Sequence, residues 1–355
     1  EPAGKFRTNG LEIITQLLNS EINNITVGAG YRAHKQYDIR YWANFNTTSN
    51  VPPPIPLSGG YQEVSSWGNW ASEPDYHEND WSLYGQDDLA ISEKMSVIAG
   101  LRYDKYEQFG GVFNPRAGLT YMASDSTALK LLYGRAFRAP SYVERFTMNN
   151  PAYVGTPDLD PETVDTIESS VNYILQNFSI ELGIYNSKYK DLIVLGEKPS
   201  VTEPAPYINK DKATSNGTEL TVRNKIFDTL SLMLNFSCQS IKNDSTNENF
   251  PGISKHQGNV ELEWKVFNTT FLNTHYYVCC DRERASNDPR GPLEGYELVN
   301  ISLLSKNIGL NGLDLQISVN NLFDTEYYDP APVYTIYNDF PRPRINTMVE
   351  LKYSF

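Results

Sequence analysis

The last eleven residues, INTMVELKYSF (Ile345 to Phe355), alternate between mostly apolar and mostly polar side chains. The mostly apolar positions are Thr347, Val349, Leu351, Tyr353 and Phe355, and the positions between them are Asn346, Met348, Glu350, Lys352 and Ser354. A period of two predicts a β-strand, because successive side chains of a strand point to opposite faces of the sheet. This strand sets the phase in which the preceding sequence is interpreted.

The composition limits the class of protein. The chain has 355 residues, of which 40% are hydrophobic, and its formal net charge is -13. This length allows one large all-β domain or two ordinary domains. No apolar run approaches the roughly 18 residues that a membrane helix needs, so a helical membrane protein is not expected. The acidic balance argues against a nucleic-acid partner, which would favour basic patches.

The chain lacks the marks of an enzyme or a metal protein. Its three cysteines, Cys238, Cys279 and Cys280, form no metal-binding spacing. Cys238 and Cys280 fall on predicted strands that lie two apart, so we expect no disulfide between them. The sequence contains no HExxH, no GxSxG and no glycine-rich phosphate loop. We therefore expect no catalytic residues, no resident metal and no cofactor.

Alternation of the same kind predicts about fifteen strands. The clearest runs over residues 259–266, where Val260, Leu262, Trp264 and Val266 alternate with Asn259, Glu261, Glu263 and Lys265. In a soluble sandwich the apolar face would form the core. A face lined by charged residues suits a water-filled lumen better, and a transmembrane barrel exposes only every second side chain to lipid.

The predicted connections fall into two classes. Short turns lie near residues 19–23, 92–95, 123–126, 175–177, 226–229, 267–269 and 306–312. They alternate with longer connections near 36–80, 138–162, 191–212, 242–255, 281–293 and 323–343. The connection near 108–112 is the one exception, because it is short although it lies on the rim of the long loops. Nearly all prolines lie in the long set, where no ladder donor is needed. Short turns on one rim and long loops on the other are typical of a bacterial outer-membrane barrel.

The strand count predicts an incomplete barrel. An alternating strand that ends on a carboxyl-terminal Phe looks like the last strand of such a barrel, running towards the periplasm. Bacterial single-chain barrels have an even number of strands, whereas fifteen is odd. Counted back from the last strand, the first candidate strand, Leu11 to Leu18, runs towards the periplasm, so we expect an earlier strand before it. Glu1 is not preceded by Met or followed by a signal segment, so we expect a processed or truncated chain.

Five stretches carry a resemblance to a known family. They are NPRAGLTY (Asn114 to Tyr121), YGRAFRAPS (Tyr133 to Ser141), PDLDPET (Pro157 to Thr163), VNNLFDTEYYD (Val319 to Asp329) and the terminal KYSF. In this order they resemble the TonB-dependent outer-membrane receptors over essentially the whole chain. The resemblance implies a barrel of 22 strands around an amino-terminal plug. We therefore expect residues 1–355 to form one antiparallel transmembrane β-barrel domain with about 15 of 22 strands and no plug.

The same motifs also have structural interpretations. Arg138, Pro140 and the acidic run Asp158, Asp160 and Glu162 can shape a long loop and its return into the next strand. Asn320, Asn321 and Asp324 can cap a strand end. Arg282, Arg284 and Arg290 form a cationic loop, which we expect to pair with surface phosphate or neighbouring acids rather than with a ligand.

Substrate contacts are expected from the outer loops, where aromatic residues occur together with arginines. Guanidinium groups pair with anionic oxygens and stack on rings, which suits planar, anionic iron chelates. For any single aromatic residue, an aromatic girdle at the membrane interface is an equally physical explanation. The predicted substrate-binding residues are Trp67, Trp70, Tyr76, Trp81, Arg138, Tyr334, Tyr337, Arg342 and Arg344.

The resemblance predicts a receptor in the bacterial outer membrane that takes up a ferric siderophore or a similar scarce nutrient. Its partners would be outer-membrane lipid and the TonB complex, reached through the missing plug. Cobalamin and haem are alternative ligands. Phe137 to Pro140 matches a box of haem receptors, but Ser141 to Pro157 contains no His, and His275 is expected to be a lumen hydrogen-bonder. Two further classes stay open, a passive porin-like barrel and a soluble secreted β protein.

Overall fold

The computed structural model describes residues 2–45, 56–64, 75–150, 152–200, 203–331 and 338–354. Within these ranges the regular structure consists of nineteen strands and one short helix, α1 (Tyr142–Phe146). Seventeen strands belong to one sheet, and β17 (Tyr328–Asp329) pairs separately with β18 (Phe340–Pro341). No described helix has the length and apolar character needed to cross a membrane.

Fifteen of the described strands are long, which confirms the predicted number. They are β1 (Pro2–Asn19), β2 (Asn23–Ala43), β4 (Tyr76–Ser92), β5 (Met95–Tyr106), β6 (Gly110–Ser124), β7 (Thr127–Arg138), β9 (Glu162–Ile174), β10 (Phe178–Leu195), β11 (Ala205–Phe227), β12 (Leu230–Asn243), β13 (His256–Phe267), β14 (Thr270–Cys279), β15 (Tyr296–Ser305), β16 (Leu313–Asn320) and β19 (Asn346–Tyr353). The strands β3 (Gln62–Glu63) and β8 (Tyr153–Val154) have two residues each.

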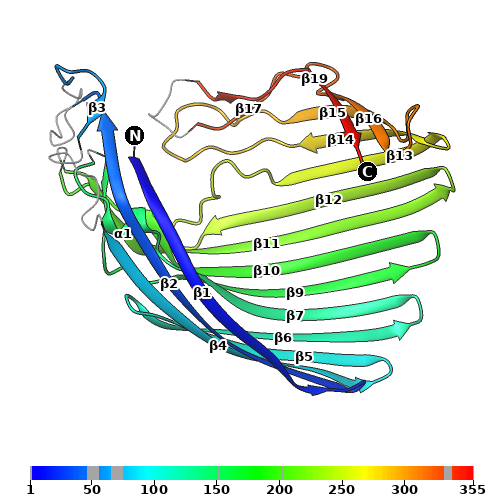
Figure 1. The fold of residues 1–355 in the computed structure, drawn as a ribbon, viewed down its shortest axis with the longest axis horizontal. Coiled ribbons are helices and arrows are strands. Elements are labelled where there is room, and N and C mark those ends of the chain that lie inside the picture. The colour runs from blue at the N-terminus through cyan, green and yellow to red at the C-terminus, as the bar shows by residue number, and fades with distance from the viewer. Residues whose placement is uncertain are drawn as a thin grey trace. The chain divides into compact units, whose positions relative to one another are not determined.

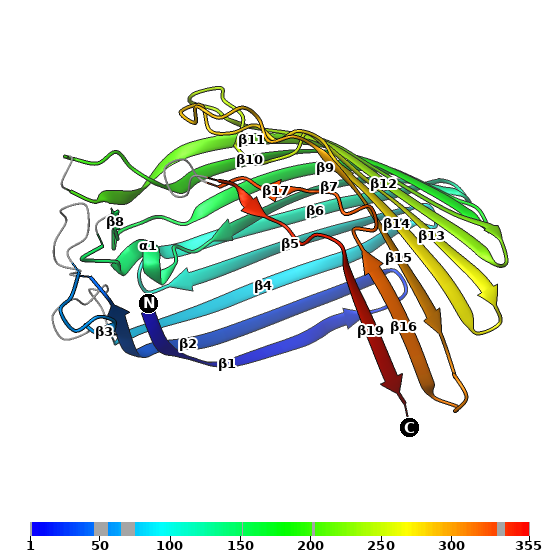
Figure 2. The same cartoon turned by 90° about the horizontal axis from the view of Figure 1, so that it is seen from above.

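The chain divides into two compact units. Unit 1 comprises residues 1–119, 132–167 and 187–213, and unit 2 comprises residues 120–131, 168–186 and 214–355. In unit 1, β1, β2, β4 and β5 lie side by side as antiparallel neighbours (Figure 1). In unit 2, β12 to β16 and β19 do the same (Figure 2). The predicted all-β, antiparallel fold is confirmed, and closure of the sheet is not observed among the described residues.

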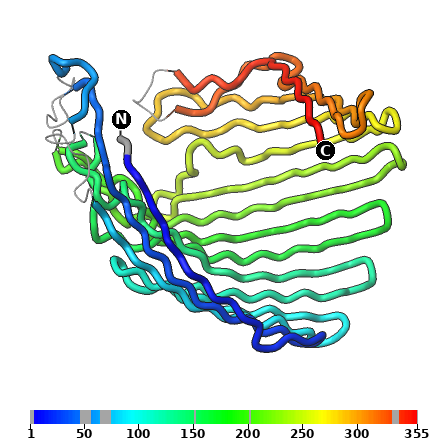
Figure 3. The backbone as a smooth tube through the Cα atoms, viewed as in Figure 1, coloured from blue at the N-terminus to red at the C-terminus, as the bar shows by residue number. Residues whose placement is uncertain are grey.

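The predicted turns are confirmed, but two long connections are shorter than predicted. Tight turns join β4 to β5, β13 to β14 and, through 306–312, β15 to β16 (Figure 3). The connection predicted at 36–80 spans only 44–75, because β2 continues to Ala43 and β4 begins at Tyr76. The connection predicted at 191–212 spans only 196–204. A strand needs only about 9–11 residues to cross a bilayer, so β2 and β11 extend beyond it. In β11 both faces are polar over residues 209–212 and the alternation disappears, whereas residues 36–41 of β2 still alternate.

The pairing register separates a polar and an apolar face in unit 2. Glu261 lies opposite His275, and Leu262 lies opposite Leu232 and Thr274. Leu262 and Trp264 are 37% and 50% exposed, as expected of side chains that face away from a polar lumen. All three cysteines are free, which confirms that Cys238 and Cys280 are not bridged.

Close packing on the polar face of unit 1 requires glycine at one position. Gly28 on β2 lies opposite Tyr84 on β4, and the ring of Tyr84 occupies the space that a Cβ atom at Gly28 would need. The Tyr84 hydroxyl donates a hydrogen bond to Glu12 Oε1 at 3.2 Å. A long tyrosine therefore lies across β2 and reaches β1 only because residue 28 has no side chain.

Replacement of Leu262 by Arg tests which face contacts lipid. A cation at mid-bilayer on the lipid face should lower the free energy of unfolding by about 2–4 kcal/mol. Gln316→Arg places the same side chain on the polar face and is expected to have a much smaller effect. The measurement is denaturant unfolding in lipid vesicles. Equal effects of the two substitutions would remove the assignment of faces, and a larger effect of Gln316→Arg would reverse it.

Candidate ligand-binding site

A column of aromatic rings runs along the polar face of unit 2. His275 and Tyr277 on β14 stack with ring centroids 6.5 Å apart. Tyr277 contacts Tyr296 on β15 at 5.9 Å, and Tyr296 contacts Tyr327 at 4.6 Å. Residues 275 and 277 share a face because they are two apart on one strand, and Tyr296 joins them because it lies opposite Cys279. The column leads from the strands to the loop segment that carries Tyr327.

His275 is held at the inner end of this column by two amides. Its Nε2 lies 3.0 Å from Asn259 Oδ1, and its Nδ1 lies 3.2 Å from Asn300 Nδ2. The Nε2–H donates and Nδ1 accepts, so both ring nitrogens are engaged. The prediction that His275 is a hydrogen-bonding residue of the polar face is confirmed, and neither nitrogen is available as an iron ligand without breaking one of these bonds.

Arg282 lies at the loop end of the column. Its guanidinium lies over the ring of Tyr296, 5.3 Å from the centroid. Nη2 donates to the carbonyl of Tyr328 at 2.6 Å, and Nη1 lies 3.3 Å from Asp329 Oδ1. The side chain is buried, and its Nε has no hydrogen-bond partner among the described residues. A buried guanidinium donor without an acceptor is unfavourable in the free protein.

Asp329 is shared by two arginines. Arg342 Nη1 lies 3.4 Å from the second oxygen of this carboxylate, and its side chain is half exposed. Arg282 and Arg342 together carry one more positive charge than Asp329 neutralises. We call these three residues the arginine node. Its surplus charge favours an anionic group above the aromatic column.

The neighbouring arginines are paired with acids. Arg284 Nη1 donates to Asp339 Oδ1 at 2.8 Å, and Arg290 Nη2 donates to Asp288 Oδ2 at 2.6 Å. Arg290 also donates to the carbonyl of Ala331 at 2.9 Å. We call Arg284, Asp288, Arg290 and Asp339 the loop clasp, because they join loop 280–295 to the last loop. For these arginines the expectation of acidic neighbours is confirmed.

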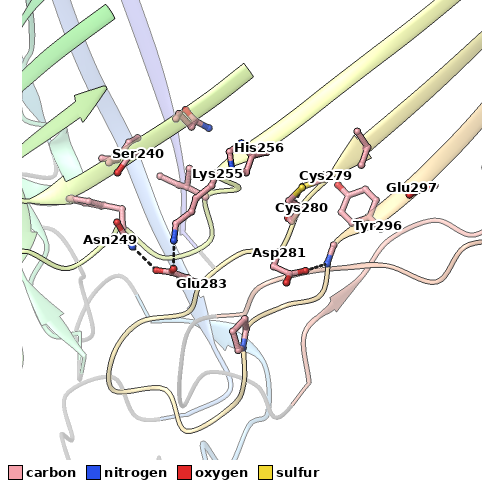
Figure 4. A pocket seen from close by; sticks show the side chains of 17 residues that line it. Ser240, Asn249, Lys255, His256, Cys279, Cys280, Asp281, Glu283, Tyr296 and Glu297 are labelled. Atoms are coloured by element: carbon pink, nitrogen blue, oxygen red, sulfur yellow. Dashed lines mark hydrogen bonds and ion pairs between the residues drawn. The ribbon is translucent and has the colours of Figure 1, made fainter. Parts of the chain in front are cut away.

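A pocket of about 590 Å³, lined in part by Tyr296 of the aromatic column, opens at the loop ends of β12 to β15 (Figure 4). Within it, Glu283 accepts hydrogen bonds from Lys255 at 2.5 Å and Asn249 at 2.8 Å. Asp281 accepts the amide of Gly295 at 2.7 Å, and Glu297 is part of the same lining. Three carboxylates against one lysine make this pocket a poor site for an anionic chelate, so the arginine node is the better candidate.

Arg138 organises a loop of unit 1. It donates to Glu162 at 2.6 and 2.7 Å and to Glu144 at 2.9 and 3.0 Å. Glu144 closes a capping box with Ser141 at the start of α1, and Glu162 accepts the amide of Ile193 at 2.8 Å. Burial alone would raise the pKa of Glu144, but the hydrogen bonds from Arg138 and Ser141 lower it below its ordinary value. This geometry matches the structural interpretation of the RAPS and DPET motifs.

Tyr76 contacts the same helix. Arg145, a buried residue of α1, donates to the Tyr76 hydroxyl at 2.8 Å and to Gln108 Oε1 at 3.1 Å. The Tyr76 ring packs on Phe146 with centroids 4.8 Å apart. Two of the predicted site residues, Tyr76 and Arg138, are therefore brought together, and both hold α1 in place.

Other predicted site residues lie elsewhere. Trp81 is on the face opposite to Asp80, where its ring contacts Tyr103 at 5.5 Å. Tyr103 in turn contacts Phe113 at 4.5 Å, which favours an aromatic girdle as the role of Trp81. Arg344 pairs with Asp324 at 2.8 Å and Glu326 at 3.2 Å. Trp67, Trp70, Tyr334 and Tyr337 lie outside the described residues.

The motif VNNLFDTEYYD builds a turn. Asn321 and Asp324 both adopt positive φ, of 52° and 54°. The side chain of Asn321 bonds the amide and carbonyl of Thr325 at 2.8 and 2.7 Å. Asp324 accepts the amide of Ile345 at 3.0 Å as well as Arg344. Asn321 and Asp324 therefore cap strand ends, as the structural interpretation predicts.

Tyr296, Tyr327 and Arg282 are absent from the predicted site residues. Tyr296 is in phase with Asn300 and Ser302, so the alternation of β15 is a usable signal for its face. Arg282 and Tyr327 lie in loops, where no period exists to give a side chain a direction. The sequence assigns Arg282 to a neighbouring acid instead, and Asp329 is such an acid.

A long-stranded antiparallel sheet with a charged face, an apolar face and turns of two lengths is the structure of an outer-membrane β-barrel protein. The family model described as "TonB dependent receptor-like, beta-barrel" matches residues 5–322. The chain belongs to this family, whose members lie in the bacterial outer membrane.

Individual relatives agree with this assignment. The chain is 21% identical over 280 residues to the ferrienterobactin receptor of Escherichia coli (strain K12), and the match covers 69% of this chain and 36% of that protein. It is 24% identical over 316 residues to the heme/hemopexin utilization protein C of Haemophilus influenzae (strain ATCC 51907 / DSM 11121 / KW20 / Rd), covering 75% and 42%. The chain thus spans well under half the length of the curated relatives that it matches.

Solved structures show the same fold. A mutant of the ferric enterobactin receptor from Pseudomonas aeruginosa, in complex with enterobactin, superposes with a TM-score of 0.81 at 18% identity, covering 99% of this chain and 55% of that one. The siderophore receptor PirA from Acinetobacter baumannii gives a TM-score of 0.78 at 19% identity, covering 99% and 55%.

The loop clasp predicts a pH dependence. Hydrogen bonds from Arg290 lower the pKa of Asp288 to about 2, and hydrogen bonds from Arg284 lower the pKa of Asp339. A carboxyl group whose pKa is lowered by folding stabilises the folded state above its ordinary pKa of about 4 and loses this contribution as the pH falls through the lowered value. We expect the clasp to hold at pH 4.5 and to open towards pH 2.

Pepsin cleavage of loop 280–295 between pH 4.5 and pH 2 measures this opening. The Asp339→Asn variant should be cleaved at pH 4.5 as readily, relative to an unfolded reference, as the unmodified protein is near pH 2. A variant as resistant as the unmodified protein at pH 4.5 would show that the ion pairs do not hold the loop.

Proposed function

We propose that the protein takes part in the uptake of a ferric siderophore, or a similar scarce and anionic metal chelate, across the outer membrane. The observation that carries the proposal is the arginine node at the end of the aromatic column. Family membership and relatives whose names specify enterobactin receptors support it. Energy supply by the TonB complex, through a plug domain, is part of the same proposal and rests on the family alone.

The chemistry of the node suits such a ligand. Anionic chelate oxygens can accept hydrogen bonds from Arg342, whose side chain is half exposed, and from Arg282 when they displace Asp329. Tyr296 and Tyr327 present ring faces and edges beside the node, which favours a ligand with planar groups. Asp329 holds the two guanidinium groups in the free state at 3.3 and 3.4 Å, distances long enough for a better acceptor to replace it.

Haem, cobalamin and passive solutes differ in what they need from these residues. Haem would need an available axial ligand, and His275 is engaged at both nitrogens. Cobalamin would make less use of a surplus positive charge than a ferric chelate would. A passive porin-like barrel would need no specific contact with the node at all.

Binding measurements with the Arg282→Gln/Arg342→Gln double variant test the proposal. Each hydrogen bond to a charged group contributes about 1.5–3 kcal/mol, so the affinity for an anionic ferric chelate should fall by at least about tenfold. Arg342→Gln alone, at a half-exposed position, guards against a folding defect in the double variant. Unchanged affinity of both variants would remove the node from the site.

Arg344→Gln serves as the comparison. If Arg344, Arg138 and Tyr76 contact ligand as the sequence predicts, their substitution should weaken binding as well. If they only hold the loops, binding should change little while the loops become easier to cleave. Growth rescue of cells that express the protein, with a panel of ferric chelates, cobalamin and haem, then identifies the ligand, and rescue by cobalamin or haem alone would contradict the proposed class.

A further inference from the structure

The outer end of unit 1 carries a row of cationic side chains on its apolar face. The register places Arg7 of β1 opposite Lys35 of β2, and Lys35 opposite His77 of β4. Lys5 lies one step further along β1 on the same face, and Lys105 of β5 lies opposite Trp81. All five side chains are exposed, and four of them belong to lysines or arginine. We call Arg7, Lys35 and His77 the cationic row.

This arrangement is unfavourable in the free chain. Like charges directly opposite one another on neighbouring strands destabilise a sheet, and Arg7 and Lys35 form such a pair. Lys5 is neutralised by Asp38 at 2.8 Å. Among the described residues neither Arg7 nor Lys35 pairs with a carboxylate: Arg7 donates to Asn9 at 3.3 Å, and Lys35 lies over the ring of Tyr37 at 5.3 Å.

The acids nearby do not remove the surplus. Asp38 is occupied by Lys5 and by Arg40, at 2.8 and 2.9 Å. Glu107 accepts the side chain of Asn79 at 3.1 Å. Asp75, two residues before His77 in the sequence, adds one more carboxylate near the row. A locally positive surface in a chain of formal net charge -13 points to an anionic partner.

The position of the row indicates which partner. Tyr31 lies opposite Trp81 on this face, and the rings of Trp81, Tyr103 and Phe113 continue as a band. Such a band marks the membrane interface of a barrel. The row lies four residues further along β2, which is about 13 Å along the strand. Side chains just beyond an aromatic girdle meet lipid headgroups, and long cationic side chains reach towards them.

We propose that the cationic row binds the phosphate groups of a phosphorylated lipid in the outer leaflet of the outer membrane. The guanidinium of Arg7 and the ammonium of Lys35 would share the phosphate oxygens, with His77 as a further donor. The anion would convert the repulsion between Arg7 and Lys35 into a pair of favourable contacts. This inference rests on the outer-membrane location and not on the identity of the imported ligand.

The test uses the full chain in phosphatidylcholine nanodiscs, titrated with lipid A that carries two phosphates and with the same lipid after removal of both. Native mass spectrometry counts the bound lipid molecules. The phosphorylated lipid should bind at least about tenfold more tightly than the dephosphorylated one. Each cation near a membrane surface contributes about a factor of five, so the Arg7→Gln/Lys35→Gln variant should lose about 25-fold in affinity.

Lys94→Gln is the matched control for Lys35→Gln. Lys94 is an exposed lysine of unit 1 in the turn between β4 and β5, at the opposite end of the same strands, so its loss should leave lipid binding unchanged. Lys35→Arg keeps the charge and should retain binding. Unchanged heat-modifiable migration on a gel establishes that each variant is folded.

Three results would overturn the proposal. They are equal binding of the two lipids, a double variant that binds as tightly as the unmodified chain, and displacement of the lipid by millimolar inorganic phosphate, which would assign the row to a free anion. In each case chelate binding at the arginine node should be unaffected, so a failure here is distinguishable from a failure of the proposed function.

Discussion

The cross-strand register is the constraint on which the other features depend. Side chains alternate with a period of two, so a slip of one residue would exchange the faces of a whole strand. In β13 such a slip would move Leu262 and Trp264 to the polar face and Glu261 and Glu263 to the apolar one. A membrane sheet cannot accept this exchange, because charged side chains on the lipid face are destabilising near the midplane, by about 2–4 kcal/mol for Arg or Lys and by less for Glu. The continuous register of β12 to β16 and β19 fixes the faces of His275, Tyr277 and Tyr296 in the aromatic column.

The loops depend on a different interaction, the sharing of charged groups. Arg138 bridges two glutamates that belong to α1 and to the start of β9. Arg344 bridges Asp324 and Glu326, and the loop clasp uses two arginines and two aspartates. In each case a guanidinium ties a loop segment to its neighbours through charged hydrogen bonds. In the arginine node one carboxylate serves two arginines, as Asp38 serves Lys5 and Arg40 in unit 1. The node differs from Asp38 in its position at the end of the aromatic column.

The sequence predicts the fold well where alternation is strong, as in β13 and β19. The outer end of β11 escapes prediction because polar residues such as Lys210 and Asp211 occupy both faces there, although the strand continues. The outer end of β2 is missed although Tyr37 and Ile39 still alternate with polar residues. The site is harder to predict for a related reason. Arg342 lies near aromatic residues in the sequence, whereas only the three-dimensional structure shows that Arg282 lies on Tyr296. The direction of a loop side chain is specified by no sequence period.

Many arginines and lysines of this acidic chain pair with a carboxylate. In the described residues of this protein, Lys5, Arg138, Arg284, Arg290 and Arg344 all do so. Arg7 and Lys35 on the apolar face of unit 1 pair with no carboxylate of the described residues, and the arginine node on the polar face of unit 2 has one carboxylate for two arginines. Both combine surplus positive charge with aromatic rings, but their rings face different surroundings. On the apolar face the rings mark the level of the headgroups, so the charges meet lipid phosphate. On the polar face the rings line a surface that contacts water, so the same combination of cation and ring can bind a soluble anion.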